Sequence, residues 1–166
     1  MRHLIWILLG TLFLPLCAQA KTIVVPMYLV AQNGTGESVG DVTIRSATQG
    51  GVVFTPHLHG LTPGVHGFHI HQKPSCDDLG MAAGDHLDPT KTNKHEGPFK
   101  DGHLGDLPTI FVADDGTSTA SQLASRLSMA DLSDHALMIH KGGDNYSDIP
   151  EKNGGGGARM VCGVIR

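Results

Sequence analysis

Apolar and polar positions along most of the chain follow the two-residue period of a half-buried strand rather than the period of a helix. Turn residues such as Asn33-Gly34 and Asp114-Asp115-Gly116 separate the apolar runs. The pattern predicts eight strands, at Thr22–Val30, Val39–Arg45, Val52–Leu58, Val65–His71, Thr109–Ala113, Thr117–Ser121, Ala136–His140 and Arg159–Ile165. Eight short strands without a long helix predict one all-β domain, a sandwich or barrel.

Two long stretches have no periodicity, and both are rich in turn residues. They cover Gln72–Leu107 and Lys141–Ala158. Loops of this length are either functional or disordered, and the histidines in the first favour function. We expect the glycine run Gly154–Gly157 to form a flexible lead into the last strand. A helical turn is expected at Ser128–Asp134, with Ser128 as its N-cap. Pro26 predicts an edge position or a bulge in the first strand.

The first twenty residues have the pattern of a secretory signal peptide. Arg2 precedes the apolar run Leu4–Leu16, and Ala18-Gln19-Ala20 is a small-x-small cleavage pattern. The run is too short to span a bilayer, so no membrane anchor is expected. Cys17 invites a lipoprotein interpretation, but the bulky Leu16 before it favours simple cleavage. We therefore expect residues 1–20 to be cleaved near Ala20 and residues 21–166 to form the mature domain.

The composition of the remaining chain indicates which partners are not expected and how its cysteines could pair. Without Arg2, 11 basic residues stand against 16 acidic ones, which gives a net charge of −5. Nucleic acid is therefore not an expected partner, because the chain has no basic stripe and few aromatic residues. Cys76 and Cys162 are the cysteines that remain after cleavage. In a secreted chain they most simply form one disulfide, and the alternative is two unrelated thiols.

The histidines are candidate metal ligands. His69 and His71 point to one face of a strand, although such a pair alone fits a core or surface position better than a metal site. In the first long loop, three imidazoles and one carboxylate are the ligand types of a closed zinc site. These residues are His86, His95, His103 and Asp106.

A second candidate site involves the end of a later strand. His140 could face His69 and His71, and several imidazoles together suit copper(II). Six histidines and one aspartate cannot fill two four-coordinate sites unless one residue is shared. An imidazole can be shared, because it has two ring nitrogens.

Five segments, in chain order, resemble the copper/zinc superoxide dismutase family. They are Gly67–His71, His86–Pro89, Lys94–Pro98, Gly102–Leu107 and Ala158–Ile165. The signal peptide and His140–Tyr146 resemble the bacterial periplasmic branch of that family in particular. The resemblance implies an eight-stranded antiparallel Greek-key sandwich, or flattened barrel, with two long functional loops. It also implies that one-electron cycling of copper disproportionates superoxide into oxygen and hydrogen peroxide, which protects the cell envelope.

The resemblance also implies a role for each site residue, with one copper ion and one zinc ion per subunit. It places copper on His69, His71, His86 and His140, and zinc on His86, His95, His103 and Asp106. His86 is then the shared ligand and the proton carrier. Asp144 is expected to link His69 with His95, Arg159 to dock the substrate, and Cys76 to pair with Cys162. His66 is expected to support its strand, and His57, His59 and His135 match no ligand position.

An anionic substrate raises the question of how an acidic protein attracts it. Fast capture requires a locally positive region around the site. The candidate cation beside Arg159 is Lys141, and the further contributors are Lys73, Lys91, Lys94 and Lys152.

Two other classes of function remain. One is a copper/zinc carrier without turnover, and the other is a zinc hydrolase, which three histidines and Asp106 disfavour by closing the zinc shell. The sequence does not decide between a monomer and a homodimer.

Overall fold

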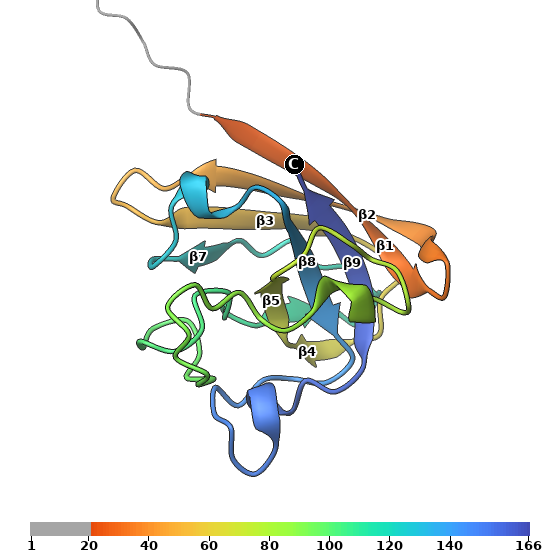
Figure 1. Cartoon of the computed structure of the whole chain (residues 1–166). Helices are drawn as coiled ribbons and strands as arrows, with labels where there is room; N and C mark the ends of the chain where they lie inside the picture. The colour runs from red at the N-terminus through yellow and green to blue at the C-terminus, as the bar shows by residue number, and fades with distance from the viewer. Residues whose placement is uncertain (1–20) are drawn as a thin grey trace, which may run out of the picture.

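The computed structural model describes residues 21–166, so the predicted signal peptide and Cys17 lie outside the described residues. The described chain is built of short strands and three single-turn 3-10 helices (Figure 1). The strands are β1 Thr22–Ala31, β2 Gly34–Ser46, β3 Val52–Leu58, β4 Gly64–His66, β5 Phe68–His71, β6 Ile110–Val112, β7 Gln122–Ala124, β8 His135–His140 and β9 Arg159–Ile165. The helices are η1 Met81–Ala83, η2 Met129–Asp131 and η3 Lys152–Gly155.

The strands form one curled antiparallel sheet and a short two-stranded ribbon. The large sheet has the order β5-β8-β9-β1-β2-β3-β7, and the ribbon pairs β4 with β6. Phe54 on β3 and Phe68 on β5 meet edge to face with ring centroids 5.8 Å apart. Strands from opposite parts of the sheet therefore face each other across one core. The predicted all-β antiparallel architecture is confirmed.

One predicted strand divides into two. Val65–His71 is interrupted at Gly67, whose N–H donates to the carbonyl of Gly142 instead of to a strand partner, at 2.8 Å. β4 therefore pairs with β6, while β5 pairs with β8. The division brings the number of strands among residues 21–166 to nine instead of the predicted eight. It also turns β5, with its two histidines, toward β8.

The prediction of a strand at Thr117–Ser121 was wrong. The Asp115 carboxylate accepts hydrogen bonds from both the N–H and the hydroxyl of Thr117, which extends the turn. Only Ser118 then bridges to Leu58, and the strand that pairs with β3 is β7, starting at Gln122. The predicted helical turn is confirmed at η2, where Ser128 and Asp131 form a capping box.

Pro26 lies where β1 lacks a registered partner on β9. The ladder between β1 and β9 includes only Tyr28 and Leu29, and the register of β1 against β2 shifts directly after Met27. The prediction of a bulge is therefore correct within one residue, whereas β1 is not an edge strand because β2 and β9 flank it. The missing N–H of proline interrupts no ladder bond there.

β8 is buried on both faces because its two faces contact two different apolar clusters. Alternate residues of β1 and β3, such as Val25 and Phe54, point into the main core, as the two-residue period predicts. On β8, Leu137 and Ile139 belong to this core, while Ala136 and Met138 join a smaller cluster with Cys76, Ala83 and Cys162. The first long loop supplies this outer cover.

No helix within residues 21–166 is long and apolar enough to cross a membrane.

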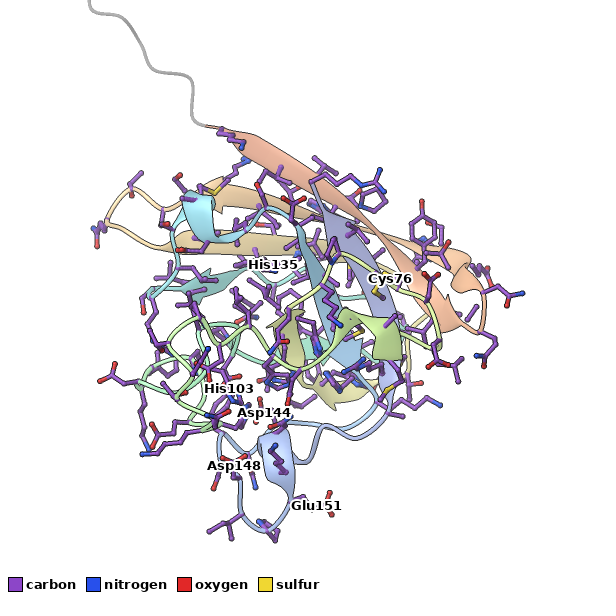
Figure 2. The ribbon with its side chains drawn as sticks, in the orientation of Figure 1. Cys76, His103, His135, Asp144, Asp148 and Glu151 are labelled. Atoms are coloured by element: carbon purple, nitrogen blue, oxygen red, sulfur yellow. A yellow bond between two sulfur atoms is a disulfide. The ribbon has the colours of Figure 1, made fainter. Side chains whose placement is uncertain are left out.

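Cys76 and Cys162 form the predicted disulfide between the first long loop and β9, with their Cα atoms 5.7 Å apart. Figure 2 shows Cys76 beside β9. The two long loops gather at one end of the sheet, next to β4 and β5 (Figure 1). That end holds the candidate site.

Candidate metal centre

Four histidines from separate parts of the chain meet at the end of the sheet. His69 and His71 lie on β5, His140 ends β8, and His86 joins the strand through a bridge opposite His71. One ring nitrogen of each lies within 4.8 Å of those of the other three, and all four residues are buried. The sequence pair His69 and His71 is therefore part of a cluster and not an isolated core pair.

Hydrogen bonds to backbone carbonyls fix the tautomers of two of these rings. His71 Nδ1 lies 2.9 Å from the Gly84 carbonyl, and His140 Nδ1 lies 3.1 Å from the Gly157 carbonyl. A carbonyl only accepts, so both Nδ1 atoms carry hydrogen and both Nε2 atoms present lone pairs. Those Nε2 atoms are 3.4 Å apart. Two facing lone pairs repel each other unless a cation lies between them, which is the arrangement that suits a metal ion.

Asp144 connects the two halves of the site. Its Oδ2 lies 2.8 Å from His69 Nε2, and its Oδ1 lies 2.7 Å from His95 Nε2. The backbone N–H of Tyr146 donates to Oδ1 as well. Because the carboxylate accepts from both Nε2 atoms, the other ring nitrogens, Nδ1 of His69 and Nδ1 of His95, are directed into the site. The arrangement expected for Asp144 is present.

Asp106 is the centre of the second group. Its Oδ1 lies 2.9 Å from His86 Nδ1, and its Oδ2 lies 3.0 Å from His95 Nδ1. The ligand atoms of His69, His86, His95 and Asp106 all lie within 4.8 Å of one another. His103 is not part of this tighter group, although its Nδ1 is 3.4 Å from Asp106 Oδ1. Figure 2 shows His103 in the first long loop and Asp144 at the start of the second.

The electrostatics leave three imidazoles neutral at neutral pH. Burial, reinforced by the neighbouring His86, lowers the pKa of His69 to about 3. Burial likewise lowers the pKa of His140 to about 4 and the pKa of His71 well below its ordinary value. Burial raises the pKa of Asp106, but hydrogen bonds from His103, His86 and His95 outweigh it and lower the pKa far below normal. These groups are thus in the protonation states that bind cations.

His95 differs, and its behaviour gives a prediction for metal uptake. Burial lowers its pKa, but Asp106 and Asp144 outweigh this effect and raise the pKa to about 9. Metal-free protein therefore carries a proton on His95 below about pH 9, and zinc must displace it. We expect zinc affinity to rise with pH up to this value, with release of about one proton per ion at pH 7. Calorimetry in buffers of different ionisation enthalpy measures the release, and uptake without a proton at pH 7 would contradict it.

Several buried polar atoms of this cluster lack well-aligned hydrogen-bond partners, although His95 Nδ1 and Asp106 Oδ2 lie 3.0 Å apart. They are His69 Nδ1, His95 Nδ1, His103 Nδ1 and Asp106 Oδ2. Such atoms are costly when buried, and three of the four belong to His69, His95 and Asp106, which are residues of the second group of potential metal ligands. Imidazole nitrogen and carboxylate oxygen are the ligands that copper and zinc take in proteins. Fold and site together define an antiparallel β protein with two neighbouring groups of buried residues that could each hold a metal ion and that have His69 and His86 in common.

Comparison with known proteins gives the family. Residues 38–165 match the family described as copper/zinc superoxide dismutase. Superoxide dismutase [Cu-Zn] 1 of Salmonella typhimurium is 53% identical over 155 residues, which cover 87% of each chain. The superoxide dismutase [Cu-Zn] of Escherichia coli strain K12 is 50% identical over 158 residues, which cover 90% of this chain and 91% of that one.

A solved structure from the same family has a similar fold. The Cu/Zn superoxide dismutase from Brucella abortus superposes with a TM-score of 0.83 at 45% identity, over 88% of this chain and all of that one (100%). The chain belongs to the copper/zinc superoxide dismutase family and is an oxidoreductase. The family implies copper and zinc as cofactors, and the two residue groups fit them.

Arg159 lies beside the first group of histidines. Its guanidinium donates to the carbonyls of Gly80 and Gly84 in the first long loop. Burial lowers the pKa of Arg159, while the Asp85 carboxylate opposes that shift. Arg159, His71, His86 and His140 line a cavity of about 330 Å³. The half-buried cation and the open side of the histidine cluster therefore face one space.

The cation predicted to guide the substrate lies next to this cavity and not in its wall. Lys141 is exposed and lines a neighbouring hollow, which shares Arg159 with the cavity. The lysine in the cavity wall is Lys152, one of the further contributors expected from the sequence. Two acids, Asp85 and Glu151, line the same cavity. Sequence patterns gave no reason to single out either of them.

The glycine run before β9 does more than lead into the last strand, because it also packs against the site. Gly154 is buried with a φ of +76°, and a Cβ there would lie 1.9 Å from Asp144 Oδ1 and 2.7 Å from His95 Nε2. Only glycine allows the backbone to close over this pair. Gly157 then supplies the carbonyl for His140. The signal in the sequence was a glycine run that ends two residues before Arg159.

Other polar contacts hold the second long loop against the first. Asp148 accepts the N–H of His95 at 2.9 Å and that of Asn153 at 3.1 Å. His66 supports the end of β8, as expected, because its ring nitrogens lie 2.8 Å from the carbonyls of His140 and Thr62. These anchors fix where the site residues stand.

Proposed function

We propose that the protein disproportionates superoxide in the bacterial periplasm and that its metal ions occupy the two residue groups. Copper would be held by His69, His71, His86 and His140, and zinc by His86, His95, His103 and Asp106. The observation that carries this assignment is the pair of overlapping groups of buried residues whose ligand atoms lie within 4.8 Å of one another, with His103 Nδ1 3.4 Å from Asp106 Oδ1 beside the second group. A bound copper ion supplies the one-electron exchange that disproportionation requires.

The protein residues have separate tasks in this proposal. Arg159 binds the anion in the cavity through the N–H groups that remain free after Gly80 and Gly84 are bound. His86, whose Nδ1 lies 2.9 Å from Asp106 Oδ1 on the proposed zinc side, would carry a proton on its other nitrogen, Nε2, to the departing product. Asp144 keeps the His69 and His95 rings in place. Gly154 allows the second long loop to pack directly against Asp144 and His95.

Replacing Arg159 with alanine tests the docking role. We expect the dismutation rate to fall at least tenfold while copper and zinc contents stay unchanged, because a charge-assisted contact to the anion is lost. Pulse radiolysis at low salt measures the rate, and elemental analysis measures the metals. Arg45→Ala is the matched control, since Arg45 is exposed on β2 away from the cavity. An unchanged rate in Arg159→Ala would exclude the docking role.

A carrier that binds both metals without turnover is the alternative function. It predicts full metal content with no dismutation beyond that of the same amount of free copper. The presence of Arg159 in the cavity with the histidines favours the enzyme, because a carrier has no use for an anion-binding group there. Metal analysis and a dismutation assay on the same sample separate the two functions.

The location outside the cytoplasm is supported by two features. The disulfide between Cys76 and Cys162 favours an oxidising compartment, and the curated relatives come from Gram-negative bacteria. Cleavage near Ala20 in this proposal leaves a domain of residues 21–166. Fractionation followed by N-terminal sequencing of the exported protein tests it, and a chain found intact in the cytoplasm would contradict it. Size measurement in solution would distinguish a monomer from a homodimer.

A further inference from the structure

Asp85 brings a negative charge into the cavity where an anion is expected to bind. It directly precedes His86, and its exposed side chain lines the cavity together with Arg159 and Lys152. Glu151 lines the same cavity from the outer part of the second long loop (Figure 2). Two cations and two carboxylates therefore surround the cavity, so its wall has little net positive charge.

The Asp85 carboxylate is held in a fixed position. Its Oδ1 accepts the N–H of His86 at 2.9 Å and the side-chain amide of Asn153 at 2.9 Å. Both donors are uncharged, so they orient the carboxylate without neutralising it. Among residues 21–166, no lysine or arginine nitrogen lies within 4.0 Å of an Asp85 oxygen. The negative charge is thus uncompensated by any direct ion pair.

This charge opposes Arg159 at the place where Arg159 acts. Asp85 is the charged group whose field on Arg159 is strong enough to affect its pKa. A carboxylate that attracts the guanidinium also repels an anion approaching it, and the cavity walls concentrate both fields. The hydrogen bond to Asn153, by contrast, helps to hold the second loop over the site. Asp85 therefore helps to hold the second long loop in place, but its charge makes the electrostatic potential around Arg159 less positive.

We propose that Asp85 limits the rate at which the cavity captures its anionic substrate, so that removing its charge makes the enzyme faster. The inference rests on the proposed function, because it takes the cavity at Arg159 as the place of substrate capture. Asp85 is then a residue that sets the rate at which the substrate anion associates with the enzyme. The hydrogen-bonding role and the charge of Asp85 are separable, since an amide oxygen can accept the same two hydrogen bonds.

The test is the variant Asp85→Asn, measured as fully metal-loaded protein. We expect the second-order rate of superoxide dismutation to rise about two- to fivefold at an ionic strength of about 0.01 M, which is the effect of one nearby charge in a largely aqueous medium. The gain should shrink toward unity at about 0.5 M salt, because screening shortens the range of the charge. Pulse radiolysis gives the rate, and metal content and thermal unfolding confirm that the site is intact.

Asp114→Asn is the matched control. It removes one negative charge from an exposed turn that does not line the cavity, so it changes the net charge equally and should leave the rate unchanged. An Asp85→Asn rate equal to or below that of the wild type would overturn the proposal. So would a gain that persists at high salt, or an equal gain in Asp114→Asn. A wild-type protein without dismutation would instead overturn the proposed function.

Discussion

Replacing Asp144 with alanine is expected to weaken metal binding by about 10- to 100-fold, as losses of carboxylates behind metal-binding imidazoles do. The carboxylate accepts from His69 Nε2 at 2.8 Å and from His95 Nε2 at 2.7 Å. Without it, both rings lose the contact that directs their Nδ1 atoms into the site. Because His69 is a proposed copper ligand and His95 a proposed zinc ligand, the affinity for both metals should fall together. Competition with a chelator of known affinity measures each metal separately.

Asp114→Ala provides the control for the loss of one acidic side chain, because Asp114 is exposed in a distant turn. It should bind both metals as the wild type does. If Asp144→Ala lost affinity for only one metal, the role of Asp144 as a link between the two groups would be wrong. If it lost none, the tautomers would be set by other contacts.

Removing the disulfide is expected to destabilise the protein by about 4–5 kcal/mol in the chain-entropy model of loop closure. The bond joins residues separated by 86 positions, so the reduced unfolded chain gains much freedom. The double variant Cys76→Ser and Cys162→Ser also places two hydroxyls in the apolar cluster with Ala83, Ala136 and Met138. Urea unfolding of the metal-free protein measures the difference.

Reduction of the wild-type disulfide without mutation controls for the hydroxyls. It should lower the free energy of unfolding by nearly the same amount as the double variant. A loss below about 1 kcal/mol would show that the loop is held mainly by packing and not by the crosslink.

Local patterns in the sequence predicted most strands because their burial alternates with period two. Val52–Leu58 was predicted with both ends correct, since its alternate residues Val52, Phe54 and Leu58 all face the core. Patterns could not show that the Val65–His71 run divides, because Gly67 leaves the strand to bond Gly142, far away in the chain. Nor could they show that Asp115 would capture Thr117 in a turn. Both outcomes depend on competing partners for backbone groups.

Local sequence patterns also could not predict the whole candidate site. Residue types alone indicated two groups of metal ligands, but the roles of Asp144 and Arg159 came from the family resemblance. The structure adds what neither source contained. The close approach of Gly154 to His95 and the placement of Asp85 in the cavity wall arise only when the two long loops pack together.

The Gly84 carbonyl is an acceptor for both His71 Nδ1 and the Arg159 guanidinium. One backbone atom is thus the common reference for a histidine of the first group and for the cation beside it. A shift of this carbonyl therefore acts on His71 and Arg159 together and not on one of them alone. In the proposed function, one atom of the loop would thus position both the anion-binding cation and a histidine of the copper group.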